Sequence, residues 1–186
     1  DRRSLKPMSH ETKTEFRPVN IAVLTVSDSR IFADDKSGDT LVARLEADGH
    51  ILGDRKIVKD EIPLITAQLQ AWVDDPAIEV VISTGGTGVT GRDVTPEAFA
   101  EVWEKDIPGF GELFRWISYQ KIKTSTLQSR ACAGVANGTY LFALPGSPGA
   151  CKDGWDEILH DQLDIRHKPC NFVELMPRLN EHLKLA

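Results

Sequence analysis

The stretch Ile78 to Glu97 reads IEVVISTGGTGVTGRDVTPE and passes from an apolar run, through a glycine-rich segment, to a helix start. The apolar run Ile78 to Ile82 is β-branched with few polar interruptions, which is typical of a strand covered on both faces in a parallel sheet. Thr95 is suited to cap a helix and Pro96 to occupy its first position. The stretch therefore predicts a strand, a loop and a helix in that order.

The segment Thr84 to Gly88, here called the glycine loop, breaks the apolar run. Glycines permit positive φ and remove the Cβ atoms that keep a ligand away from the main chain, so backbone N–H groups can converge on an anion. A loop between the carboxyl end of a strand and a helix is also where open α/β sheets bind ligands. The same residues are compatible with a plain flexible connection in which Asp93 is a solvated turn residue.

The glycine loop matches neither of the common nucleotide-binding patterns. It reads neither GxGxxG nor GxxxxGK[ST], and no lysine follows it. The sequence therefore indicates neither the dinucleotide nor the P-loop mechanism.

Strand and helix patterns alternate along the chain, which predicts a mainly parallel sheet with helices on both faces. The Asn-Gly pair at 137 and 138, between two short apolar runs, predicts a hairpin. We expect an α/β three-layer sandwich with a C-terminal hairpin. The segment Ser118 to Ser129 has no clear pattern and is left without an expected helix or strand. The expected strands are 20–26, 51–58, 78–82, 130–135 and 139–144, and the expected helices begin at the N-cap Ser37 and near residues 62, 95, 110 and 150.

Bulk properties place the chain among ordinary globular proteins. Its 186 residues fit a single domain at 18–186 after a polar tail at 1–17 without the apolar core of a secretory signal. The net charge of −6 argues against a nucleic-acid partner, and no apolar run approaches the ~20 residues of a membrane span. We expect a cytoplasmic protein.

The cysteine and histidine patterns favour no disulfide framework and no metal cage. Cys132, Cys151 and Cys170 are an odd number without CxxC spacing. The five histidines are scattered without ligand spacing, as expected of surface or packing residues. A reducing compartment fits this composition.

Polar clusters follow three of the predicted strands, at Ser27-Asp28, at Asp60-Glu61 and at Ser83-Thr84 with Asp93 further on. Consecutive parallel strands place such ends on one side of the sheet, so these clusters should meet in one crevice. Carboxylates would repel a phosphate there unless a divalent cation lies between them, an arrangement that Mg²⁺ prefers. The residues thus predict a site for a magnesium nucleotide, although Asp60 is also compatible with a simple helix-start carboxylate.

Several motifs resemble, in the same order, those of the MoaB/MogA family of molybdenum cofactor biosynthesis proteins. The glycine loop followed after four residues by Asp93 to Ala98 resembles the family signature. The similarity covers about residues 16 to 173, and the segment near its end resembles the MoaB branch. The other matching segments are Leu24 to Asp28, Asp35 to Gly38, Leu144 to Pro148 and Lys168 to Phe172.

The resemblance implies a molybdopterin adenylyltransferase, which moves AMP from MgATP to the phosphate of molybdopterin and releases pyrophosphate. Asp60 and Asp93 match the family aspartates, and their matched role is to hold Mg²⁺ and orient the phosphates. The matched pterin- and phosphate-binding residues are Thr84, Gly85, Gly86, Thr87, Gly88 and Ser147, and the matched nucleotide-binding residues are Ser27, Asp28, Ser37 and Gly38.

The resemblance also implies a homo-oligomer, a trimer or a hexamer, and contact with other proteins of the pathway. Phe110, Phe114 and Trp116 are expected to be exposed and to serve the oligomer interface. Members of the MoaB branch are assigned as adenylyltransferases less uniformly than those of the MogA branch. The alternative is therefore a pterin- or nucleotide-binding assembly protein without transfer activity.

Overall fold

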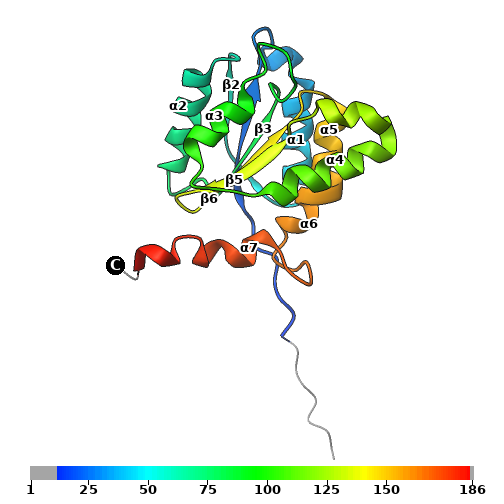
Figure 1. The fold of residues 1–186 in the computed structure, drawn as a ribbon. Helices are drawn as coiled ribbons and strands as arrows, with labels where there is room; N and C mark the ends of the chain where they lie inside the picture. Colours follow the sequence, from blue (N-terminus) through cyan, green and yellow to red (C-terminus); the bar gives the residue numbers. More distant parts are fainter. Residues whose placement is uncertain (1–11, 185–186) are drawn as a thin grey trace, which may run out of the picture.

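The computed structural model describes residues 12–184, which form a six-stranded sheet between two helical layers (Figure 1). The strand order is β2-β1-β3-β6-β5-β4, in which β2, β1, β3 and β6 pair in parallel and β5 pairs antiparallel with both β6 and β4. The expected α/β sandwich with a mainly parallel sheet is confirmed. The strands are β1 (Asn20–Val26), β2 (Ile51–Val58), β3 (Val80–Thr84), β4 (Lys105–Asp106), β5 (Cys132–Ala136) and β6 (Thr139–Leu144).

The central strands are buried on both faces, which explains their nearly unbroken apolar sequence. In β3, Val80 and Ile82 pack in one core and Val81 packs in the other. The first core lies under α1 (Lys36–Ala47), α4 (Pro108–Ile122) and α5 (Pro148–Gly154). The second lies under α2 (Ile62–Val73) and α3 (Thr95–Val102).

The sheet contains a point where the strand order reverses. From β1 the chain passes through α1 to β2 on one side, and β3 then pairs with β1 on the other side. The carboxyl ends of β1 and β3, at Val26 and Thr84, lie next to each other at this point. In open α/β sheets such a switch point opens a crevice for ligands.

The predicted cap of α1 is wrong. Asp35, not Ser37, is the N-cap, because its carboxylate accepts the N–H of Gly38 at 3.0 Å. Asp35 is fixed in that position by Arg55 of β2, whose Nη2 lies 3.0 Å from its carboxylate, and by the hydroxyl of Thr25 in β1. The helix therefore starts one residue before Ser37, which lies in its first turn.

The predicted cap of α3 is also wrong. Val94 occupies the N-cap position without a side-chain cap, and Thr95 is already the first helical residue. The hydroxyl of Thr95 donates to the carbonyl of Gly85 at 2.8 Å and accepts no N–H of the helix. A tertiary contact thus uses the group that would otherwise cap the helix.

The hairpin of β5 and β6 is confirmed, with Asn137 and Gly138 in its turn at φ of 47° and 79°. It is not the end of the fold, because a helical region follows it. This region contains α5, a π-helical turn (Trp155–Leu159), α6 (His160–Gln162) and α7 (Phe172–Leu175), and then the 3-10 helices Met176–Arg178 and Glu181–Lys184.

Helix α4 corrects two expectations. It extends to Ile122 and continues as a 3-10 helix, Lys123–Gln128, through the segment that had no clear pattern. Phe110 and Phe114, expected to be exposed, are only 4% and 2% exposed because they face the sheet on one side of the helix. Trp116 lies on the other side and is 64% exposed.

Residues 12–19 precede β1 without regular secondary structure, and the rest of the predicted tail, residues 1–11, lies outside the described residues. The boundary placed between residues 17 and 18 stays a prediction. Over residues 12–184, none of the helices combines the length and the apolar character needed to cross a membrane.

Candidate functional site

The glycine loop adopts a conformation that only glycine tolerates at two positions. Gly85 and Gly86 have φ of 104° and 69°. A Cβ on Gly85 would lie 2.2 Å from the carbonyl oxygen of Val26, at the end of β1. The main chain of the loop therefore packs directly on β1. Only a residue without a Cβ allows the two backbones to come so close.

Three backbone amides of the loop are free. Gly85 donates its N–H to Leu144 at 3.0 Å, whereas Gly86, Thr87 and Gly88 donate to no acceptor within residues 12–184. All three of these residues line a cleft of about 440 Å³. Adjacent unpaired N–H groups beside a helix start are suited to bind an anion.

This hollow, here called the glycine-loop cleft, is bounded by α4, by the 3-10 helix after it and by the loop before α5. Ser147, a predicted site residue, lies on its rim and caps α5 by accepting the N–H of Ala150 at 3.1 Å. The polar wall that faces the glycine loop could not be placed from the sequence, because it comes from the segment 118–129, which has no clear local pattern. That wall consists of Ser118, Ser125, Gln128 and Ser129.

Arg130 was not predicted as a site residue, but its side chain fixes the segment that follows the glycine loop. Its Nε donates to the carbonyl of Gly88 at 2.7 Å and its Nη2 donates to the carbonyl of Asp93 at 2.8 Å. The guanidinium also pairs with Glu97 of α3, and this hydrogen bond lowers the pKa of the Glu97 carboxyl. Arg130 thus joins both ends of the segment 88–93 to the start of α3.

Asp93 lines the glycine-loop cleft. Its Oδ2 accepts the N–H and the hydroxyl of Thr90 at 3.0 and 2.7 Å, which closes a turn in the loop. Its Oδ1 accepts no hydrogen bond from residues 12–184 and is available to a ligand.

Asp60 lies behind the glycine loop, close to Gly86. Its Oδ1 is 3.1 Å from the position that a Cβ on Gly86 would occupy, and its backbone N–H donates to Asp28 at 3.2 Å. Burial raises the pKa of the Asp60 carboxyl, and the negative charge of Asp28 raises it further. An ionised Asp60 is therefore stabilised by any cation that binds beside it.

Asp28 and Arg92 form a bridge between the end of β1 and the loop after β3. Two hydrogen bonds of 2.9 and 2.8 Å join the guanidinium to the carboxylate, and they lower the pKa of the Asp28 carboxyl. Asp28 thus contacts both Asp60 and Arg92, so the polar ends of the three strands lie close together. The roles assigned to these residues stay predictions.

A second hollow, here called the β1–β2 cleft, has a volume of about 410 Å³. Of the predicted nucleotide-binding residues, Ser27 and Asp28 line it. Ser37 and Gly38 are buried beneath the surface, and the hydroxyl of Ser37 donates to the carbonyl of Gly146 at 2.7 Å. Ser37 therefore joins α1 to the loop before α5. The remaining lining residues are Ser29, Arg30, Ile31, Phe32, Ile57, Val58 and Lys59.

The donor set fits Mg²⁺ only if the ligand supplies part of its coordination. Asp60 and Asp93 each have a carboxylate oxygen without a hydrogen-bond partner among residues 12–184. No group of three His, Cys, Asp or Glu side chains converges as a metal site in that part of the chain. One or two carboxylates completed by phosphate oxygens and water is the arrangement that Mg²⁺ prefers.

Cys151 and Cys132 are not set up as nucleophiles. Cys151 lies under the loop before α5, and burial raises the pKa of its thiol to about 11. Burial raises the pKa of Cys132 to about 12. At neutral pH both side chains are thiols, and the thiolate is the reactive form.

Comparison with known proteins points to one family. A profile described as the probable molybdopterin binding domain matches residues 22–165. Molybdenum cofactor biosynthesis protein B of Escherichia coli K12 is 48% identical over 162 residues, which cover 87% of this chain and 95% of that protein. The protein of the same name from Staphylococcus aureus Mu50 is 44% identical over 158 residues, which cover 83% and 94%.

Solved structures agree with the sequence comparison. A crystal structure of a molybdenum cofactor biosynthesis protein B superposes with a TM-score of 0.75 at 34% identity, covering 91% of this chain and 98% of that one. The tungsten cofactor synthesizing protein MoaB from Pyrococcus furiosus gives a TM-score of 0.69 at 34% identity, covering 78% and 92%. The molybdopterin biosynthesis Mog protein from Mycobacterium ulcerans gives 0.69 at 28% identity, covering 78% and 97%.

Proposed function

Since this chain belongs to the family of molybdenum cofactor biosynthesis proteins with the probable molybdopterin binding domain, we propose that it transfers AMP from MgATP to the phosphate of molybdopterin. The observation that supports this most strongly is the glycine loop itself. Gly86, Thr87 and Gly88 line the glycine-loop cleft, and their amides are free to receive an anion. The phosphate of the pterin is such an anion.

The rest of the cleft suits a flat polar ring system. Phe114 and Ile122 supply apolar surface, while the serines and Gln128 of the opposite wall supply hydrogen-bonding groups. Ligand pockets commonly combine an apolar lining with a few placed polar groups. We therefore place the pterin between the glycine loop and the wall formed by α4 and the 3-10 helix after it.

Asp60 and Asp93 are the residues that would hold Mg²⁺, because each offers a free carboxylate oxygen beside the glycine loop. A bound Mg²⁺ neutralises phosphate charge and aligns the phosphates for attack. Without a cation, the carboxylates of Asp28, Asp60 and Asp93 would repel both each other and a nucleotide.

The proposed reaction asks the protein mainly to position its substrates. An oxygen of the pterin phosphate attacks the α-phosphorus of ATP, a new P–O bond forms, and the bond to the leaving pyrophosphate breaks. Phosphoryl and nucleotidyl transfers of this kind depend on alignment and charge neutralisation rather than on a covalent intermediate with the protein. A rigid glycine loop, fixed by Thr95 and Arg130, serves that purpose.

Pyrophosphate release in the presence of molybdopterin and MgATP tests the proposal. Asp93→Asn keeps the side-chain shape and one acceptor oxygen for Thr90, but it removes the charge. We expect transfer to slow by about 100-fold, the scale observed when one electrostatic group is removed from an active site. Asp60→Asn should behave similarly, and the double variant should lose little more because the two residues act as a unit.

Asp74→Asn, at the exposed end of α2, is the matched control and should transfer at the parent rate. Molybdopterin affinity should stay within a few-fold in all of these variants, because the glycine loop rather than the carboxylates contacts the pterin. Transfer by Asp93→Asn at the parent rate would remove Asp93 from the mechanism. Binding of molybdopterin by the parent without pyrophosphate release would instead favour a non-catalytic assembly protein.

A further inference from the structure

Arg30 connects the two clefts of the site. It follows β1, lines the β1–β2 cleft, and donates from Nη1 to the hydroxyl of Ser37 at 3.1 Å. Ser37 in turn donates to the carbonyl of Gly146 at 2.7 Å, and Gly146 lines the glycine-loop cleft. The backbone N–H of Arg30 is also fixed, because it donates to the hydroxyl of Ser27 at 3.1 Å.

The charge of Arg30 is unbalanced, unlike that of its neighbours. Arg92 is paired with Asp28, Arg55 with Asp35, and Arg130 with Glu97. Within residues 12–184, Arg30 forms no ion pair. A guanidinium has five N–H donors, and only one protein acceptor among those residues is bonded to this one.

In the proposed reaction, the bound nucleoside triphosphate has to extend from one cleft to the other. The pterin phosphate is held by the glycine loop in one cleft, and the predicted nucleotide-binding residues Ser27 and Asp28 lie in the other. The α-phosphorus must come next to the pterin phosphate, and the β- and γ-phosphates follow it with negative charge that a cation has to compensate. Arg30 lines one cleft and is linked through Ser37 to Gly146 of the other, so its guanidinium is connected to both.

We propose that Arg30 binds the β- and γ-phosphates of the nucleoside triphosphate, the groups that leave as pyrophosphate. This inference rests on the proposed function and extends it to the leaving group. When the bond between the α-phosphorus and the bridging oxygen breaks, its electron pair goes to the pyrophosphate. A planar guanidinium binds two phosphate oxygens at once and compensates for that charge.

The test compares probes with and without phosphates on the Arg30→Gln variant, by titration calorimetry. MgATP and magnesium pyrophosphate should each bind at least about tenfold more weakly, because charge-assisted hydrogen bonds contribute that much or more. Adenosine and molybdopterin should bind as they do to the parent protein. Arg30→Lys keeps the charge but not the planar fork, so its loss should be smaller.

Arg178→Gln is the matched control, because Arg178 is an exposed arginine in the C-terminal 3-10 helix Met176–Arg178. It should bind every probe as the parent does, and thermal unfolding should show that each variant is folded. Unchanged MgATP and pyrophosphate affinity in Arg30→Gln would overturn the inference alone, and so would an equal loss of adenosine affinity. Absence of MgATP and pyrophosphate binding by the parent would overturn both the inference and the proposed function.

Discussion

At Gly86 the backbone is held between two side chains that the site needs. A Cβ there would lie 2.3 Å from the hydroxyl of Thr95 and 3.1 Å from Oδ1 of Asp60. Because φ is 69°, any L side chain would also strain the loop. Gly86 is thus a position where a single methyl group disturbs the loop, its anchor in α3 and a proposed magnesium ligand together.

Gly86→Val should therefore weaken molybdopterin binding by more than tenfold, measured by equilibrium titration. It should also destabilise the fold, since strain at such a position costs about 1–3 kcal/mol. Gly91→Ala is the control in the same segment, because nothing lies within 4 Å of its added Cβ and its φ is not positive. Equal molybdopterin affinity in Gly86→Val and the parent would remove the glycine loop from the binding site.

At the scale of the element, the start of α3 is coupled to the glycine loop through Thr95. The Thr95 side chain is fully buried, and its hydroxyl and N–H donate to the carbonyls of Gly85 and Gly86 at 2.8 and 3.0 Å. Thr95→Val keeps the shape but leaves the Gly85 carbonyl without its partner. The free energy of unfolding in urea should fall by about 1–3 kcal/mol, the cost of an unsatisfied buried polar group.

Thr66→Val is the matched control for that change. The Thr66 hydroxyl donates to the carbonyl of Ile62, one turn earlier in α2, at 2.9 Å, and this bond lies within the helix rather than between elements. Its replacement should change the free energy of unfolding by no more than about 0.5 kcal/mol. A loss in Thr95→Val as small as that in Thr66→Val would show that the loop is held in place without this hydrogen bond.

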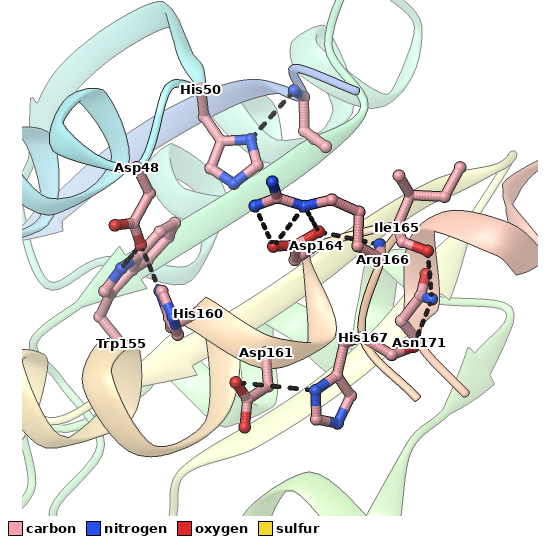
Figure 2. Close-up of polar contacts among 11 residues, drawn as sticks. Asp48, His50, Trp155, His160, Asp161, Asp164, Ile165, Arg166, His167 and Asn171 are labelled. Carbon is pink, nitrogen blue, oxygen red and sulfur yellow. Dashed lines mark hydrogen bonds and ion pairs between the residues drawn. The ribbon is translucent and has the colours of Figure 1, made fainter. Parts of the chain in front are cut away.

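A second element-scale contact joins the segment before β1 to the connection between α1 and β2. His50 is 6% exposed, and its Nδ1 accepts the backbone N–H of Val19 at 3.1 Å (Figure 2). Its ring lies between those of Phe16 and Trp155, with centroid distances of 5.2 and 5.9 Å. Protonation would convert the acceptor into a donor and leave a cation between two aromatic rings.

The charges around His50 come from several elements. Asp48 and His160 lie on one side, with Trp155 and His160 both bonded to the Asp48 carboxylate at 2.8 and 2.6 Å. Asp164 and Glu79 are further acidic neighbours, and Arg166 stacks over Phe16. Burial outweighs the attraction of the three acids, so the pKa of His50 lies below its ordinary value.

Stability should therefore fall as the pH is lowered from 7 to 5. Because the folded pKa of His50 is depressed, the unfolded state binds the proton first, and stability is lost as the pH falls through the folded pKa. His160 acts oppositely, because its hydrogen bond to Asp48 raises its pKa and the associated stability is lost as the pH rises through the raised value. His160 is half exposed, so we expect the buried His50 to dominate.

Urea unfolding at several pH values measures this effect. His50→Gln should be less stable at pH 7 and should show a flatter pH dependence between 7 and 5, since one fully titrating group contributes about 1.4 kcal/mol per pH unit. His182→Gln, at an exposed C-terminal position, should keep the slope of the parent. A parent-like slope in His50→Gln would assign the acid sensitivity to other groups.

At the scale of the whole molecule, the outer face of α4 has no covering element among residues 12–184. Leu113, Trp116 and Tyr119 are 42%, 64% and 46% exposed there. Contiguous apolar surface of this kind is characteristic of protein interfaces. The inner face, with Phe110 and Phe114, belongs to the core and contributes nothing to an interface.

We predict a closed homo-oligomer, a trimer or a hexamer, that uses this outer face of α4. Trp116→Glu introduces a charge into the patch and should shift the mass measured by light scattering to that of a monomer. Leu183→Glu, an equally drastic change at a residue that is 60% exposed near the end of the chain, should leave the mass unchanged. A monomer mass for the parent at micromolar concentration would contradict the prediction.

Local sequence patterns by themselves determined most of the elements and predicted a candidate site at the glycine loop. Apolar alternation and helical spacing predicted β1, β2, α2 and the β5–β6 hairpin near their observed limits, and the four glycines marked the loop at the switch point. These features depend on backbone propensity and on which side chains are buried, and both can be read from the residue types within a short stretch of sequence. Parallel pairing places the carboxyl ends of neighbouring strands at the same edge of the sheet. Asp28, Asp60 and the glycine loop could therefore be expected to lie near one another.

Contacts between distant residues were decided only by the tertiary structure. The choice of Asp35 over Ser37 as helix cap depends on Arg55, 20 positions away, and the Ser37 contact with Gly146 spans 109 positions. Arg130 reaches the carbonyl of Gly88 across 42 positions. Side chains suited to several local roles take the one that satisfies buried polar groups brought near by folding, and no short window of sequence contains those partners.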